Sequence, residues 1–155
     1  MRIAEILHRK GSAVSTIPST KTVDHAVHKM AELRVGALVV MDPWGKFVGV
    51  ISERDILHAL ARFGGKVLAH RVEEVMNPDV ATCGPDDRAD KVMGMMTVHR
   101  VRHLPVIDAG RLVGLVSIGD LVKHQIVERE QEAKVLRDMR ATQPSLAAAG
   151  PASRE

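Results

Sequence analysis

The sequence predicts an α/β (α+β) protein in which two β-α-β-β-α repeats pack with pseudo-twofold symmetry, followed by a C-terminal helix and a disordered tail. Two observations support this class: an internal repeat, and short Val- and Ile-rich runs that alternate with helical periodicity. The 155 residues suit one domain or two small halves that fold together. We expect repeat 1 at residues 1–66, repeat 2 at 67–128, a helical extension at 129–140 and a disordered tail at 141–155.

The internal repeat is visible by eye. Residues 45–56 align with residues 110–121 at an offset of 65, with five of the twelve positions identical. Upstream, residues 38–42 and 14–16 match residues 104–108 and 80–82 at an offset of 66, because the first turn is one residue longer. The chain is therefore expected to be two copies of one unit, whose packing would bury a shared core and leave a cleft between the copies.

Each copy is expected to contain three strands. The first is a short strand, at residues 14–17 and 80–83, that is followed by a segment with proline or glycine. Two more strands joined by a tight turn follow, at residues 37–41 with 47–51, and at 103–107 with 112–117. These short apolar runs, bracketed by Gly, Pro and Asp, are typical of buried strands.

Helices are expected between and after these strands. Apolar residues recur there at helical spacing, in copy one at Val23, Ala26, Val27, Met30 and Ala31, and in copy two at Ala89, Val92, Met93 and Met96. A second helix begins near Glu53 in copy one and near Ile118 in copy two. The latter runs on through an apolar stripe, whereas residues 141–155 show no periodic pattern, which predicts disorder.

Composition excludes several classes of function. The 22 basic and 19 acidic residues give a net charge of only +3, and Trp44, Phe47 and Phe63 are the only aromatic rings, so a nucleic-acid surface is disfavoured. A single cysteine, Cys83, excludes a disulfide framework, and the His25/His28 pair has no evident third ligand for a metal. No apolar run is long enough to span a membrane and no signal peptide is evident, so we expect a cytoplasmic protein.

The repeated pattern Gly-x-hydrophobic-Val-Gly-x-x-Ser-x-x-Asp resembles the cystathionine-β-synthase (CBS) domain in its tandem-pair form, over about residues 1–128. Residues 52–56 and 102–108 are similar to those of stand-alone bacterial members. The resemblance implies an adenosine-containing ligand: AMP, ADP, ATP or NAD(H), with S-adenosylmethionine the less favoured choice. It also implies a regulatory, non-catalytic module that forms a homodimer.

The Ser-x-x-Asp motif of each copy supplies the first candidate site residues. Asp55 and Asp120 follow Ser52 and Ser117 by three residues, each at a strand-to-helix junction. A carboxylate there can accept hydrogen bonds from both ribose hydroxyls, and a serine at a helix N-terminus can donate to a phosphate. The alternative is a helix-capping arrangement with no ligand. The occurrence of the Ser-x-x-Asp motif in both copies favours ligand binding in at least one of them.

The resemblance also implies an adenine pocket and a phosphate contact. It assigns the adenine pocket to residues of the strands, Val14, Thr16, Ala37, Leu38, Val80, Thr82, Leu104 and Pro105, although strand propensity alone also explains Val and Thr there. It assigns phosphate contacts to Arg54, Arg102 and His103, whose alternative is a solvated basic edge. These basic residues have no counterpart in the other copy: Arg54 corresponds to Gly119, and Arg102 and His103 correspond to Gly36 and Ala37. The two sites are therefore expected to differ in phosphate binding, and the sequence does not indicate which is stronger.

Three hypotheses for function follow. The leading one is a sensor of energy or redox state that binds an adenosine-containing ligand between the repeats and signals by conformational change to an unknown protein effector. The second is a structural dimerisation module with empty clefts. The third, and weakest, is nucleic-acid binding. No consistent catalytic constellation is present, which predicts a protein that is not an enzyme.

Overall fold

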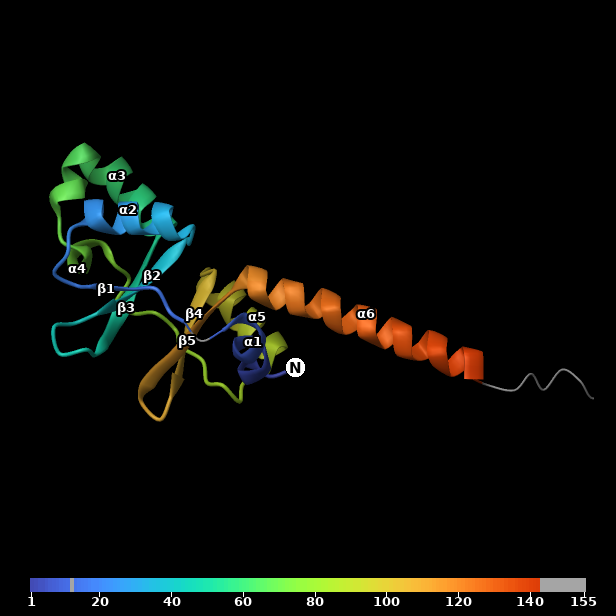
Figure 1. Cartoon of the computed structure of the whole chain (residues 1–155). Helices are drawn as coiled ribbons and strands as arrows, with labels where there is room; N and C mark the ends of the chain where they lie inside the picture. The colour runs from blue at the N-terminus through green and yellow to red at the C-terminus, as the bar shows by residue number, and fades with distance from the viewer. Residues whose placement is uncertain (12, 143–155) are drawn as a thin grey trace, which may run out of the picture. The chain divides into compact units, whose positions relative to one another are not determined.

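The computed structural model describes residues 1–11 and 13–142. Its elements, labelled in Figure 1, are α1 (Ile3–Lys10), β1 (Thr16–Pro18), α2 (Val23–Leu33), β2 (Ala37–Met41), β3 (Phe47–Ser52), α3 (Glu53–Phe63), the 3₁₀ helix η1 (Gly64–Ala69), α4 (Val72–Val75), α5 (Ala89–His99), β4 (His103–Asp108), β5 (Arg111–Ser117) and α6 (Ile118–Thr142). Contacts divide the chain into two units, residues 1–121 and 122–155. The mixed helix and strand content confirms the predicted fold class.

The first repeat contains a three-stranded sheet in the order β1-β2-β3. Strand β1 is parallel to β2, and β2 is antiparallel to β3. The β2 residues Leu38, Val39 and Val40 are fully buried. An apolar strand that is covered on both faces has no need of alternating polar residues, which explains its continuous hydrophobic run.

The second repeat departs from the predicted three strands. Strands β4 and β5 form an antiparallel pair, but residues 80–83 contribute only a single parallel bridge, between Cys83 and Val106. In the first repeat, the Val39 amide donates to Ser15 and extends the parallel pairing. Pro105 takes the place of Val39 and has no amide hydrogen to donate, so the pairing ends after one bridge. The prediction of a strand at 80–83 was wrong for this reason.

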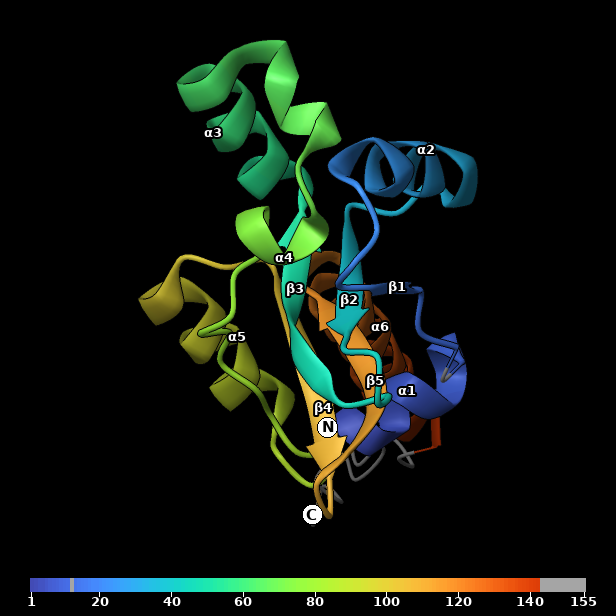
Figure 2. The same ribbon diagram turned by 90° about the vertical axis from the view of Figure 1, so that its left-hand side faces the viewer.

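Each repeat has its own hydrophobic core. Each core is completed by a short helix from the beginning of the other repeat. Helix α1 supplies Ile3, Ile6 and Leu7 to the core of the second repeat, together with α5, β4 and β5. Helix α4 supplies Val72 to the core of the first repeat, beneath α2 and α3. Figure 2 shows α1 and α5 flanking the second hairpin, and α2 and α3 side by side above the first.

Matching backbone hydrogen bonds hold both exchanged helices. The Ile3 amide donates to Asp87 and the Ala4 amide to Pro85, at 2.9 and 2.8 Å. In the other repeat, the Val72 amide donates to Lys21 and the Glu73 amide to Ser19, at 2.8 and 3.1 Å. These pairs match by symmetry, so the two halves are interlocked rather than merely stacked.

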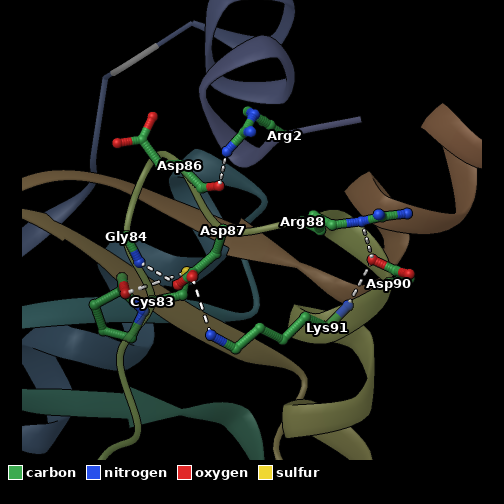
Figure 3. Close-up of polar contacts among 9 residues, drawn as sticks. Arg2, Cys83, Gly84, Asp86, Asp87, Arg88, Asp90 and Lys91 are labelled. Carbon is green, nitrogen blue, oxygen red and sulfur yellow. Dashed lines mark hydrogen bonds and ion pairs between the residues drawn. The ribbon is translucent and has the colours of Figure 1, made fainter.

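The loop before α5 is organised by its own polar contacts (Figure 3). Arg2 donates to the carbonyl oxygen of Asp86 at 2.7 Å, which adds a side-chain contact to the docking of α1. The Asp87 carboxylate accepts from the Gly84 amide at 2.8 Å and from Lys91 at 3.2 Å. The Gly84 amide and Lys91 lower the pKa of Asp87, so this carboxylate stays ionised and keeps the loop closed near neutral pH.

The sheets of the two repeats also meet. Ala37, Val39 and Val50 of the first repeat are buried, and partly buried side chains pack against them from both repeats: Val14, Met41, Phe47, Val80, Leu112 and Leu115. This contact is the shared core that the sequence repeat predicted. It also holds Val80, in the segment between α4 and α5, against the buried residues of β2 and β3.

Helix α6 continues from Val122 to Thr142 in the second unit. The first two residues of the predicted tail, Ala141 and Thr142, are therefore helical, and residues 143–155 lie outside the described residues. Within the described part of the chain, no helix has the length and hydropathy needed to cross a membrane.

Candidate functional site

A cavity of about 470 Å³ lies between the two repeats, a size typical of small-molecule pockets. The first repeat contributes the start of α3 and the end of β3. The second repeat contributes the linker at Asn77 and Val80 and the loop from α5 to β4. The lining residues are Gly36, Val50, Ser52, Glu53, Arg54, Asp55, Leu57, His58, Asn77, Val80, His99, Arg100, Val101, Arg102 and His103.

Ser52 and Asp55 lie in this cavity, at the N-terminus of α3. The Asp55 Oδ2 atom accepts from the Ser52 amide at 2.8 Å and from the Ser52 hydroxyl at 2.9 Å, and the Asp55 amide donates back to Ser52 Oγ. This is the capping arrangement that the sequence left open as an alternative. It leaves Asp55 Oδ1 without a hydrogen bond to any described residue, so the carboxylate can cap the helix and still accept from a ligand.

Three arginines line the same cavity. Arg54 follows Ser52 on α3, and Arg100 and Arg102 lie between α5 and β4. None of the three forms an ion pair with a residue in the described part of the chain. Arg100 is exposed but lines the cavity, where it caps the C-terminus of α5 with a φ of 54°.

His103 is the most buried basic group in the cavity wall. A Cβ atom placed on Gly36 would lie 3.6 Å from its Cε1 atom and 3.7 Å from the Glu53 carboxylate, so the ring lies beside both residues. Burial lowers the pKa of His103, and Lys10 and Arg102 lower it further against the opposing effects of Asp120 and Glu53. The imidazole is therefore neutral near pH 7 unless an anion enters the cavity.

The residues predicted to form an adenine pocket are not gathered in one place. Val80 lines the cavity. Four of them are buried in the sheets, so they offer a ligand at most their backbone: Ala37, Leu38, Leu104 and Pro105. Val14 packs against the buried residues between the sheets, Thr16 is partly buried in β1, and Thr82 is exposed.

The second Ser-x-x-Asp motif has a different environment. Asp120 Oδ2 accepts from the Ser117 amide at 2.9 Å, as in the first motif, but its other partner is the ammonium group of Lys10, at 2.6 Å. Burial alone would raise the pKa of Asp120, but the Lys10 ammonium and the Ser117 amide outweigh it and lower the pKa. Neither Ser117 nor Asp120 lines the cavity described above.

Sequence reasoning missed several lining residues. His58 lies three residues after Asp55, on the same face of α3, and this spacing was a usable signal. Asn77 lines the cavity because it pairs with Val50 of β3, and no pattern in the sequence predicts that pairing. Lys10, which binds Asp120 and does not line this cavity, was also missed, because it lies outside the aligned parts of the repeat.

The cavity has no metal centre or reactive thiol. No group of three or more His, Cys, Asp or Glu residues in the described ranges is placed to hold a metal ion. Cys83 is buried in the core of the second repeat, and burial, assisted by the negative charge of Asp87, raises its pKa to about 12.

Comparison with known proteins identifies the family of the chain. The family model for the CBS domain matches residues 3–62 and 72–126. The crystal structure of the CBS-domain containing protein ATU1752 from Agrobacterium tumefaciens is 35% identical, covers 80% of this chain and 92% of that chain, and superposes with a TM-score of 0.78.

Two further structures hold ligands. The CBS domain protein PAE2072 from Pyrobaculum aerophilum, complexed with AMP, is 30% identical with a TM-score of 0.69, over 77% of this chain and 89% of that chain. The CBS domain pair of protein MJ0100, in complex with 5-methylthioadenosine and S-adenosyl-L-methionine, is 26% identical with a TM-score of 0.73, over 83% of this chain and 98% of that chain. With two matched repeats and these structural neighbours, the chain belongs to the CBS domain family, as a tandem CBS pair.

Proposed function

We propose that this protein is a non-catalytic regulatory module that binds an adenine nucleotide in the cleft at Asp55. The observation that carries the proposal is the meeting of Asp55 and Ser52 from one repeat with Arg102 and His103 from the other around one cavity. A carboxylate suited to ribose lies on the first repeat, and two arginines suited to phosphate, Arg100 and Arg102, lie on the second. A nucleotide that engages both would tie the repeats together.

The charge of the cleft favours a ligand with phosphate groups. Arg54, Arg100 and Arg102 outnumber the acidic residues Glu53 and Asp55, and guanidinium groups bind phosphate in a bidentate manner. Structural neighbours hold AMP in one case and S-adenosyl-L-methionine in another. A sulfonium cation without a phosphate would leave the arginines of this chain uncompensated. AMP, ADP, ATP or NAD(H) is therefore the better fit.

Such binding can signal the energy or redox state of the cell. A ligand shifts a conformational equilibrium only by its different affinity for the two states. A nucleotide that contacts both repeats has this property, because any change in their packing separates Asp55 from Arg102 and His103. A protein effector that recognises the ligand-bound packing would then receive the signal.

Calorimetric titration tests the proposal. The purified chain, freed of carried-over nucleotide, is titrated with AMP, ADP, ATP, NAD, NADH and S-adenosylmethionine in turn. We expect saturable binding of a phosphate-containing member. Asp55→Ala should weaken it at least tenfold, because hydrogen bonds to a charged group contribute roughly 1.5–3 kcal/mol. The matched control is Asp79→Ala, an exposed carboxylate outside the cavity. Unchanged affinity in Asp55→Ala, or silence across the panel, would refute the proposal.

A structural dimerisation module is the second candidate. A groove between α2 and α3 is lined by Val27, Met30, Ile56, Leu57 and Leu60, and Leu57 is 64% exposed. Apolar side chains in one exposed groove favour contact with a second copy of the chain. Sedimentation of the wild type and of Leu57→Glu tests it: a dimer that becomes a monomer supports the homodimer, and a wild-type monomer contradicts it.

A further inference from the structure

The ammonium group of Lys10, the last residue of α1, is bound inside the second Ser-x-x-Asp motif. Its Nζ atom lies 2.6 Å from Asp120 Oδ2 and 2.7 Å from the carbonyl oxygen of Leu115. The Lys10 side chain is 34% exposed and that of Asp120 is 22% exposed. The pair is thus partly shielded from water, and the ammonium group has two fixed acceptors.

The equivalent positions in the first repeat are satisfied differently. Val50 corresponds to Leu115, and its carbonyl oxygen accepts from the backbone amide of Asn77, at 2.9 Å. Asp55 corresponds to Asp120, and its hydrogen bonds come from Ser52. The carbonyl oxygen at this position therefore accepts from the neutral Asn77 amide in the first repeat and from the charged Lys10 side chain in the second. Asp55 has no cationic partner among the described residues.

The lengths of the exchanged helices explain this difference. Helix α4 spans only four residues, and Pro78 follows shortly after it, so the chain extends and pairs Asn77 with Val50. Helix α1 spans eight residues and ends at Gly11, whose φ is 93°. The additional helical turn places Lys10 beside Leu115 and Asp120.

We infer that Lys10 closes the Asp120 site to nucleotides, so that each chain binds a single nucleotide, at Asp55. This inference rests on the proposed function. A ribose that donates to Asp120 Oδ2 must displace the Lys10 ammonium group from that oxygen and leave it with the Leu115 carbonyl oxygen. At Asp55, the equivalent oxygen accepts, among the described residues, only from Ser52 of the motif itself. Gly119 also stands where Arg54 stands in the first repeat, so the second motif lacks the neighbouring arginine.

The electrostatics of the second motif agree with this inference. The pKa of Asp120 is lowered although burial opposes the shift, because Lys10 binds the ionised form. The Lys10 ammonium group competes with a ribose hydroxyl for Asp120 Oδ2, the oxygen that also accepts from the Ser117 amide.

The test is the stoichiometry of nucleotide binding. Lys10→Met keeps the methylene groups and removes the charge, and Lys66→Met, at an exposed position in η1, is the matched control with the same loss of charge. Titration with ADP should give one site per chain in the wild type and in Lys66→Met, and two in Lys10→Met. Asp55→Ala should weaken binding at least tenfold, so that ADP at concentrations that saturate the wild type gives no measurable site, and adding Lys10→Met to it should restore one site. Thermal unfolding of each variant confirms that it is folded.

The outcomes separate the two claims. One site in Lys10→Met, together with none in the Asp55→Ala/Lys10→Met chain, overturns the inference and leaves the proposed function intact. Two sites in the wild type, one of them lost on Lys10→Met, would also overturn it and make Lys10 a ligand contact. A wild-type chain that binds no ADP refutes the proposed function and the inference together.

Discussion

The carbonyl oxygen of Asn77 lies 2.6 Å from the position that a Cβ atom would take on Gly49. The glycine is thus required because the segment after α4 packs directly on β3. The symmetry-related glycine, Gly114, has the same constraint from a different source: a Cβ atom there would lie 2.6 Å from the Leu7 side chain. Gly49 therefore makes room for the segment that follows α4, and Gly114 makes room for α1.

Alanine substitutions at these two glycines should differ in cost. Gly49→Ala forces a backbone shift, so we expect a loss near the upper end of the roughly 1–3 kcal/mol typical of overpacking. Gly114→Ala meets only a movable side chain, and we expect a loss of about 1 kcal/mol. Urea unfolding of both variants measures the difference. Equal losses would contradict the account of Gly49.

The contact between Gly114 and Leu7 can be tested separately with a double-mutant cycle. Leu7→Ala alone should cost about 2–5 kcal/mol, because Leu7 is buried. In the Leu7→Ala/Gly114→Ala chain the new methyl group fills part of the vacated space, so the total loss should be less than the sum of the single losses. Strict additivity would show that α1 does not press on Gly114.

His103 should make the stability of the unliganded chain depend on pH. Its pKa in the folded chain lies below the ordinary value of about 6.5, so the unfolded chain binds more protons. The free energy of unfolding should fall as the pH drops below about 6.5, with no contribution from this group above that value. Urea unfolding at pH 7.5 and pH 5.5 measures the effect, which His103→Gln should reduce and His25→Gln, at an exposed position, should not. An identical pH dependence in His103→Gln and the wild type would contradict this role.

The phosphate-binding role of Arg102 can be separated from adenosine binding. Arg102→Met should weaken ADP binding by about 10- to 100-fold, the equivalent of one charge-assisted hydrogen bond. Binding of adenosine, which has no phosphate, should be unaffected. Arg111→Met, at an exposed position of β5, serves as the control. If Arg102→Met weakened both ligands equally, the residue would act on the fold of the cleft rather than on phosphate.

Cys83 should be almost inert to thiol reagents in the folded chain. With a pKa of about 12, only about one thiol in 10⁴ is ionised at pH 8. Labelling with iodoacetamide should therefore be slow in buffer and fast in urea. Rapid labelling of the native chain would contradict the burial of Cys83 in the core of the second repeat.

The repeat in the sequence made most of the fold predictable, because two aligned copies reinforce each apolar run. It failed at residues 80–83, where the substitution of Pro105 for Val39 removes one amide and with it a strand. It also could not show that α1 completes the second core, because the exchange is a property of tertiary packing. The motif pointed to Asp55, and the family resemblance pointed to Arg54 and His103, but the sequence did not indicate that the three would line one cavity, as they do in the structure. The binding of Lys10 to Asp120 depends on one additional turn of helix and left no mark in the pattern.

The most direct measurement for the central proposal is a crystal structure of the chain with ADP. We expect a nucleotide between the repeats, with its ribose hydroxyls on Asp55 and its phosphates among Arg54, Arg102 and His103. Lys10 should still bind Asp120 in that complex. A nucleotide bound at Asp120, or one that leaves Asp55 without a ligand, would contradict it.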